Sequence, residues 1–165
     1  IADDGGAPRQ GAGEFDLLPA FCQPIPVIVI DDEQVDRYTV KRRLARHGGF
    51  DEVLEARSGD AFLIDYCDRI PPIEFDSAPV LILIDINMPG RNGFETVEEL
   101  QRRQDEGRAP PSVVVMMFTS SSNPKDKQRA KALPLVNGYI EKPIDADGVE
   151  QVFDLYRSHV TGKAA

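Results

Sequence analysis

Short apolar runs alternate along the chain with longer stretches of mixed character. Three of these runs, 26–30, 80–84 and 113–118, are continuously apolar. Runs of this kind predict strands that are buried on both faces, as in parallel sheets. Two weaker runs, 51–56 and 138–140, predict two further strands.

The stretches between and after these runs predict five helices, over 33–47, 59–67, 93–105, 124–133 and 146–160. The last helix has the clearest pattern, with apolar residues at steps of three and four along one face: Val149, Val152, Phe153, Tyr156 and Val160. The first helix has a weaker pattern, with five residues at imperfect helical spacing: Val35, Thr39, Val40, Leu44 and His47.

Five strands that alternate with five helices predict an α/β fold, a doubly wound sandwich whose helices cover both faces of a parallel sheet. We expect one domain over residues 25–160. Residues 1–24, rich in Gly, Ala and Pro, are expected to form a flexible N-terminal extension, and residues 161–165 a C-terminal tail. The connection 67–79 is long and proline-rich, which makes it a candidate contact loop for a partner.

Composition and charge narrow the classes of function. Acidic residues outnumber Lys and Arg by 28 to 19, for a formal net charge of −9 at pH 7. This balance and the absence of tryptophan argue against nucleic acid or an anionic membrane as a partner. Cys22 and Cys67 are too few for a disulfide framework or a zinc site, so we expect reduced thiols in a cytoplasmic protein. No apolar run reaches the ~20 residues of a membrane span.

The polar residues that follow the predicted strands form the main candidate site. They stand at the ends of four different strands: Asp31, Asp32, Asp85, Thr119 and Lys142. Because ligands of such folds bind beyond the carboxyl ends of the strands, we expect these side chains to lie together. Singly, each has a structural explanation, such as a helix cap for an aspartate or a surface position for the lysine. Because all of them stand at the ends of predicted strands, one shared functional site is a better explanation than a separate structural role for each residue.

The chemistry of these residues favours a bound metal ion. Three carboxylates held within ~5 Å of one another repel by a few kcal/mol per pair, so a cation must offset their charge. Oxygen ligands without His or Cys indicate a hard ion, and a few carboxylates with retained water suit Mg²⁺. Once the metal and a lysine neutralise the pocket, one aspartate can attack an incoming phosphoryl group.

Four motifs resemble the receiver domain of two-component response regulators, over about residues 24–160. VIVIDDE resembles the family's acidic pair after the first strand, and LILIDINMPGRNG resembles its phosphoacceptor motif. MFTSSSNPKD resembles the strand end that carries the family's hydroxyl group, and GYIEKP its aromatic, lysine and proline. The motifs occur in the family's order. The chain is similar to stand-alone, single-domain regulators of the chemotaxis and phytochrome-associated types.

The resemblance implies a flavodoxin-like (βα)₅ fold with strand order 2-1-3-4-5. It implies that Asp85 is the phosphoacceptor and that Asp32 and Asp85 bind Mg²⁺ directly. Asp31 would act on the ion mainly through a water molecule, and Asn87 would offer its main-chain carbonyl.

The resemblance also implies that Thr119 and Lys142 bind phosphoryl oxygens, that Thr119 and Tyr139 form a switch, and that Pro143 follows a cis peptide bond. Which hydroxyl group takes part stays open. Counting back from Lys142 favours Ser120. The connection before Tyr139 looks one residue longer than the family's usual one, and for this reason we prefer Thr119.

The function implied is that of a signalling phosphoacceptor rather than an enzyme. A sensor histidine kinase or a histidine phosphotransfer protein would be the donor, and the signal would leave by protein contact or onward phosphotransfer. Few residues follow the last predicted helix, so we expect no output domain. The helices 124–133 and 146–160, with the strand 138–140, would form the output face for a target protein or a homodimer.

Alternatives from other classes are a Mg²⁺-dependent phosphatase that works through an aspartyl phosphate and a pseudo-receiver that binds partners without phosphorylation. The phosphatase class requires an Asp-x-Asp pair on its first strand, where this chain has Asp31, Asp32 and Glu33 in succession. The complete set of acids, hydroxyl and lysine argues against the pseudo-receiver. A flavodoxin-like electron carrier needs a phosphate-cradling loop after the first strand, and acids there would repel the phosphate.

Overall fold

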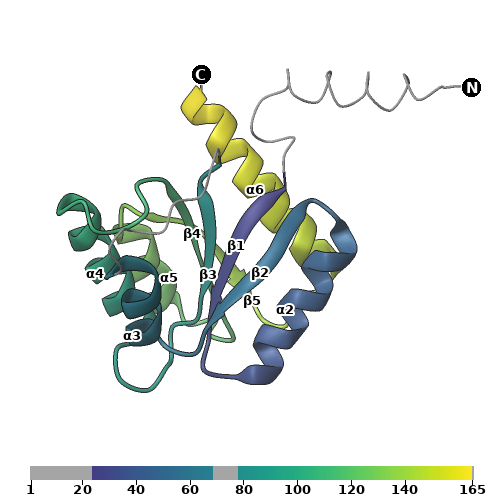
Figure 1. Cartoon of the computed structure of the whole chain (residues 1–165). Helices are drawn as coiled ribbons and strands as arrows, with labels where there is room; N and C mark the ends of the chain where they lie inside the picture. Colours follow the sequence, from purple (N-terminus) through teal and green to yellow (C-terminus); the bar gives the residue numbers. More distant parts are fainter. Residues whose placement is uncertain (1–23, 69–77, 165) are drawn as a thin grey trace, which may run out of the picture.

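Five parallel strands form one sheet in the order β2-β1-β3-β4-β5 (Figure 1). The computed structural model describes residues 24–68 and 78–164. The strands are β1 (Ile25–Ile30), β2 (Phe50–Ala56), β3 (Val80–Ile84), β4 (Val113–Thr119) and β5 (Val136–Glu141). The predicted fold class and the strand order are both confirmed.

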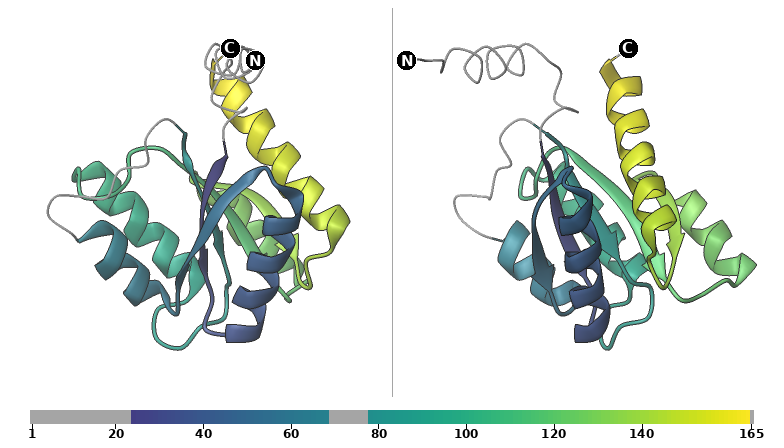
Figure 2. Two further views of the ribbon diagram at one scale, coloured as in Figure 1. Left: turned by 45° about the vertical axis from the view of Figure 1, so that its right-hand side comes forward. Right: turned by 90° about the vertical axis from the view of Figure 1, so that its right-hand side faces the viewer.

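Helices cover both faces of the sheet, as the views in Figure 2 show. They are α2 (Gln34–His47), α3 (Gly59–Phe62), the π-helical turn η3 (Leu63–Cys67), α4 (Gly93–Asp105), α5 (Pro124–Ala132) and α6 (Ala146–Ala164). Their buried side chains place α2 and α6 on one face of the sheet and α3, η3, α4 and α5 on the other.

The alternation of side chains along the strands divides the core into these two layers. In β1, Ile28 and Ile30 pack with α3, α4 and α5, whereas Val27 and Val29 pack with α2 and α6. Every residue of β3 and β4 is buried, which is why these strands stand out as continuous apolar runs. Each large aliphatic side chain buried in this way stabilises the fold by about 1.5–3 kcal/mol. The central strands therefore hold the residues at their ends in fixed positions.

The imperfect apolar spacing over α2 does not coincide with its buried face, because Val35 is 71% exposed. The residues that α2 buries are Arg37, Val40 and Leu44. Apolar periodicity does not indicate Arg37, because the pattern assigns charged residues to the surface. A charged side chain is buried only where partners neutralise it, and those partners come from elsewhere in the fold.

Other boundaries differ in detail from the expected ones. The helix expected over 59–67 is divided into α3 and η3, and the last helix continues past residue 160 to Ala164. Cys67 is a buried free thiol. Within the described part of the chain, no helix combines the length and the apolar character of a membrane span. The expectations for residues 1–23 and 69–77 lie outside the described residues.

Candidate functional site

The carboxyl ends of the strands bring the predicted polar residues to one edge of the sheet. The Asp85 N–H donates to the Ile30 carbonyl at 3.0 Å, so Asp85 lies beside the end of β1. The Lys142 N–H donates to the Thr119 carbonyl at 2.9 Å, so Lys142 lies beside the end of β4. Main-chain hydrogen bonds therefore hold the acids, the hydroxyl group and the lysine at the same edge.

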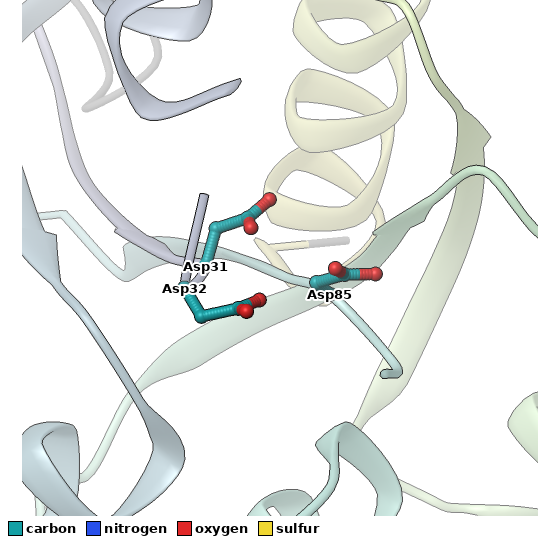
Figure 3. A group of neighbouring side chains, drawn as sticks. All are labelled: Asp31, Asp32 and Asp85. Atoms are coloured by element: carbon teal, nitrogen blue, oxygen red, sulfur yellow. The ribbon is translucent and has the colours of Figure 1, made fainter. Parts of the chain in front are cut away.

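Three aspartates form the centre of this site (Figure 3). Asp31, Asp32 and Asp85 each offer one carboxylate oxygen, and these oxygens lie within 4.8 Å of one another. Asp31 and Asp85 are buried, whereas Asp32 is exposed. Burial raises the pKa of Asp31 above its ordinary value of 3.8, because the Lys142 ammonium and the Glu33 N–H, which lower it, have the smaller effect.

Lys142 supplies positive charge to these acids. The carboxylate oxygens around its ammonium nitrogen lie at 2.7 Å (Asp31), 2.7 Å (Asp36) and 3.2 Å (Asp85). Burial alone would lower the pKa of Lys142, but its hydrogen bonds and the carboxylate charges raise the pKa overall. The lysine is therefore a permanent cation, and its single charge does not balance the acids around it.

The donor set fits a hard divalent ion. Asp31 Oδ2 is buried and, although ion-paired with Lys142, it accepts no hydrogen bond of adequate geometry among the described residues. A buried carboxylate oxygen in this condition is costly unless a further cation, or a water molecule bound to that cation, satisfies it. The adjoining open pocket offers further oxygen donors on Asp32, Asp85 and Asn87. Such a set of oxygen ligands suits Mg²⁺.

The two candidate hydroxyl groups have different surroundings. Ser120 is exposed and lines the pocket, whereas Thr119 is buried. Thr119 Oγ1 accepts a hydrogen bond from the Ser121 N–H at 3.2 Å. Strand alternation puts Thr119 on the same face of β4 as Met117, which packs in the layer that contains Tyr139. This placement is compatible with the expected link between Thr119 and Tyr139.

Three further predicted residues lie around the site. The Lys142–Pro143 peptide bond is cis, the form that the resemblance implies. Asn87 is exposed and lines the pocket. Tyr139 is half-buried, and its hydroxyl donates to the Ser121 carbonyl at 2.8 Å. Burial raises the pKa of Tyr139 above its ordinary value of 10.0.

Sequence reasoning missed two residues of α2 that belong to this site. Asp36 accepts a hydrogen bond from Lys142, and Arg37 Nη1 donates to the main-chain carbonyl of Asp31 at 2.7 Å. Arg37 Nε also donates to Glu55 Oε1 at 2.8 Å, so the buried guanidinium is paired. The sequence holds a weak signal for both residues. Asp36 lies in the first turn of the helix that follows the acidic pair, and Arg37 lies on the same helical face as Val40 and Leu44.

Comparison with known proteins identifies the family. The family described as "Response regulator receiver domain" matches residues 27–154, and this chain belongs to it. Receiver domains act as signalling phosphoacceptors in two-component systems and generally bind Mg²⁺ through acidic residues. The cluster of Asp31, Asp32 and Asp85 has the composition that this binding requires.

Similar proteins include regulators of different lengths. The nitrate/nitrite response regulator protein NarL of Escherichia coli K12 is 28% identical over 125 residues, 76% of this chain and 51% of NarL. Protein PilH of Pseudomonas aeruginosa is 26% identical over 121 residues, 73% of this chain and 88% of PilH. The aligned part thus spans about half of NarL and most of PilH. The solved structure of Vibrio cholerae chemotaxis protein CheY4 has a TM-score of 0.61 at 25% identity, covering 81% of this chain and 98% of CheY4.

Proposed function

We propose that the chain accepts a phosphoryl group on Asp85 from a sensor histidine kinase or a histidine phosphotransfer protein. The position of Asp85 carries this proposal. Its buried carboxylate lies 3.2 Å from Lys142 and opens to a pocket that it shares with Asp32. A carboxylate held by a lysine and still open to a pocket is placed to react with an incoming group.

In the proposed reaction, one carboxylate oxygen of Asp85 attacks the phosphorus atom of the donor. The bond from phosphorus to the donor's histidine nitrogen breaks, and the nitrogen keeps the electron pair of that bond. Lys142 is in reach to pair with a phosphoryl oxygen. We assign a second phosphoryl oxygen to the Thr119 hydroxyl. The chain turns over no external substrate in this scheme.

Mg²⁺ would be held by oxygen donors from four residues: the carboxylates of Asp31 (mainly through water), Asp32 and Asp85, and the main-chain carbonyl of Asn87. When bound, the ion supplies positive charge that offsets the transferred phosphoryl group. Asp32 is assigned a direct contact because its carboxylate is exposed to the pocket, whereas Asp31 is buried against Lys142.

We further propose that the signal leaves through the face formed by α5, β5 and α6. A groove between α5 and β5 lies on this face, with Lys127, Lys131 and Tyr139 in its lining. The Tyr139 hydroxyl connects this groove to the strand end that carries Thr119, through Ser121. A target protein or a second copy of the chain would bind there, in the cytoplasm. The net charge of −9 supports a protein partner over nucleic acid or membrane.

Incubation with acetyl phosphate and Mg²⁺ tests the proposed phosphoacceptor. The wild type should gain the mass of one phosphoryl group, whereas Asp85→Asn, which keeps the shape of the side chain but loses the nucleophile, should gain none. Asp105→Asn, an exposed acid at the end of α4, should be labelled like the wild type. Intact-mass spectrometry measures all three proteins. Equal labelling of the wild type and Asp85→Asn would overturn the assignment of Asp85.

A further inference from the structure

Lys142 is held more closely by Asp36 than by the proposed phosphoacceptor. Lys142 Nζ donates a hydrogen bond of 2.7 Å to Asp36 Oδ2 and one of 3.2 Å to Asp85 Oδ2. Its contact with Asp31 is also 2.7 Å long but lacks hydrogen-bond geometry. Asp36 reaches the lysine from the first turn of α2, 106 residues away in the sequence.

The two short contacts of Lys142 differ in how easily they can be exchanged. Asp31 is buried, and its other carboxylate oxygen accepts the Glu33 N–H at 2.9 Å. If Lys142 left Asp31, a buried charge would lose its cation, which is strongly unfavourable. The Asp36 side chain is 33% exposed, so water can solvate its carboxylate once the lysine moves away. Asp36 is therefore the partner that Lys142 can release at the lower cost.

A phosphoryl group on Asp85 would compete for the same ammonium. It adds close to two negative charges and three acceptor oxygens next to a lysine that has three N–H donors. Asp36 lines the same pocket and would then face the new anion with a like charge. When Lys142 releases Asp36, one of its N–H groups becomes free to donate to a phosphoryl oxygen. The lysine keeps its contact with buried Asp31.

We propose that Asp36 is a positioning residue that holds Lys142 in the unphosphorylated chain and releases it when Asp85 is phosphorylated. This inference rests on the proposed function of Asp85. In this role Asp36 stabilises the unphosphorylated state, so it limits how tightly the site binds a phosphoryl group or its analogue. Removing the charge of Asp36 shifts the balance toward the phosphorylated state.

Binding of beryllofluoride, a phosphoryl analogue, tests this role at saturating Mg²⁺, with the ¹⁹F NMR signal of the bound anion as the readout. Asp36→Asn should bind beryllofluoride about five-fold more tightly than the wild type, which corresponds to about 1 kcal/mol for a partly exposed ion pair. Asp36→Glu keeps the charge and should stay within about two-fold of the wild type. Thermal unfolding of both variants, measured alongside, separates an effect on binding from a loss of fold.

Glu33→Gln is the matched control for the loss of one charge. Glu33 lines the same pocket, and the carboxylates in contact with Lys142 in the described chain are those of Asp31, Asp36 and Asp85. Glu33→Gln should gain clearly less affinity than Asp36→Asn. Equal gains, or an unchanged or weaker affinity in Asp36→Asn, would overturn the role of Asp36 while the wild type still binds the anion. A wild type that binds no beryllofluoride with Mg²⁺ would overturn the proposed function as well.

Discussion

The Tyr139 hydroxyl donates a hydrogen bond of 2.8 Å to the main-chain carbonyl of Ser121. The N–H of the same Ser121 donates to Thr119 Oγ1 at 3.2 Å, and its hydroxyl donates to Asp126 Oδ2 at 2.6 Å. Ser121 thus connects the strand end at the site with the aromatic ring on β5 and with α5. If the Thr119 hydroxyl turns toward a phosphoryl group, it leaves the Ser121 N–H, and the contact of Ser121 with Tyr139 changes with it.

We expect Tyr139→Ala to uncouple the α5–β5 surface from the site. In the wild type, beryllofluoride with Mg²⁺ should shift the amide NMR signals near Asp85 and also those of Ser121 and of Lys127, whose ammonium lies 5.7 Å from the Tyr139 ring centroid. In Tyr139→Ala the shifts should stay near Asp85. Tyr139→Phe loses one hydrogen bond and should remain within about 1 kcal/mol of wild-type stability. A full set of shifts in Tyr139→Ala would show that Tyr139 does not couple this surface to the site.

Arg37→Ala should be strongly destabilising, although Arg37 is a charged residue. The substitution leaves the main-chain carbonyl of Asp31 without its donor and removes a partner of Glu55. The buried carbonyl left without a donor costs about 1–3 kcal/mol, and the lost packing of the buried Arg37 side chain adds to this cost. Glu55 is exposed and still pairs with Lys41, so its loss of Arg37 adds little. Arg42→Ala, on the exposed side of the same helix, should cost less than about 0.5 kcal/mol. Urea unfolding compares the two variants, and similar midpoints would show that Arg37 has no special structural role.

The central strands and the acids of the site could be predicted because both leave local signals in the sequence. β1, β3 and β4 are continuously apolar, and the polar residues follow directly at their ends. The roles of Arg37 and Asp36 could not be predicted, because they depend on partners that only the fold brings near. Arg37 pairs with Glu55, 18 residues away, and Asp36 with Lys142, 106 residues away. Apolar periodicity reports which face of α2 is buried on average but not which charges are paired there.

Gly93→Ala should disturb the loop that carries the phosphoacceptor. The Gly93 N–H donates to the Ile86 carbonyl at 2.8 Å, and a Cβ at this position would overlap with the main-chain carbonyl oxygen of Asp85. A backbone atom cannot rotate away, so we expect a loss of about 2–3 kcal/mol in stability and reduced labelling by acetyl phosphate.

Gly107→Ala is the control for this substitution. Gly107 has a φ of 74°, and a Cβ there would meet open space, so the expected cost is only about 1 kcal/mol, with unchanged labelling. Urea unfolding and intact-mass labelling should be measured for both variants. If Gly93→Ala is as stable and as well labelled as Gly107→Ala, the close approach to Asp85 is unimportant.

Mg²⁺ binding should depend more on Asp32 than on Asp31. Asp32→Ala removes the exposed carboxylate that we assign to direct contact and should abolish binding in the millimolar range. Asp31→Ala should weaken binding less, because Asp31 is assigned a contact through water. It should also be at least as stable as the wild type, since burial of the Asp31 charge raises its pKa and so disfavours the folded state at neutral pH. Calorimetric titration measures both affinities, and identical losses would remove the distinction.

Stability at high pH should depend on Tyr156, which is 1% exposed and donates to the Pro79 carbonyl at 2.6 Å. Burial raises the pKa of Tyr156 from 10.0 to about 12. The folded chain therefore holds the phenol proton more tightly than the unfolded chain. The tighter binding of this proton contributes about 3 kcal/mol to the free energy of unfolding. This contribution is fully present below about pH 10 and is lost as the pH rises through about 12.

Tyr156→Phe isolates this effect, because phenylalanine keeps the ring but has no proton to lose. Below about pH 9 the variant should be about 1 kcal/mol less stable than the wild type, since the Pro79 carbonyl loses its donor. Near pH 12 the order should reverse, because only the wild type has to ionise a buried phenol. The buried Cys67 thiol, whose pKa burial raises to about 11, weakens both proteins at high pH and cancels in their difference. Denaturant unfolding across this range measures that difference, and a constant value would contradict the role assigned to the Tyr156 proton.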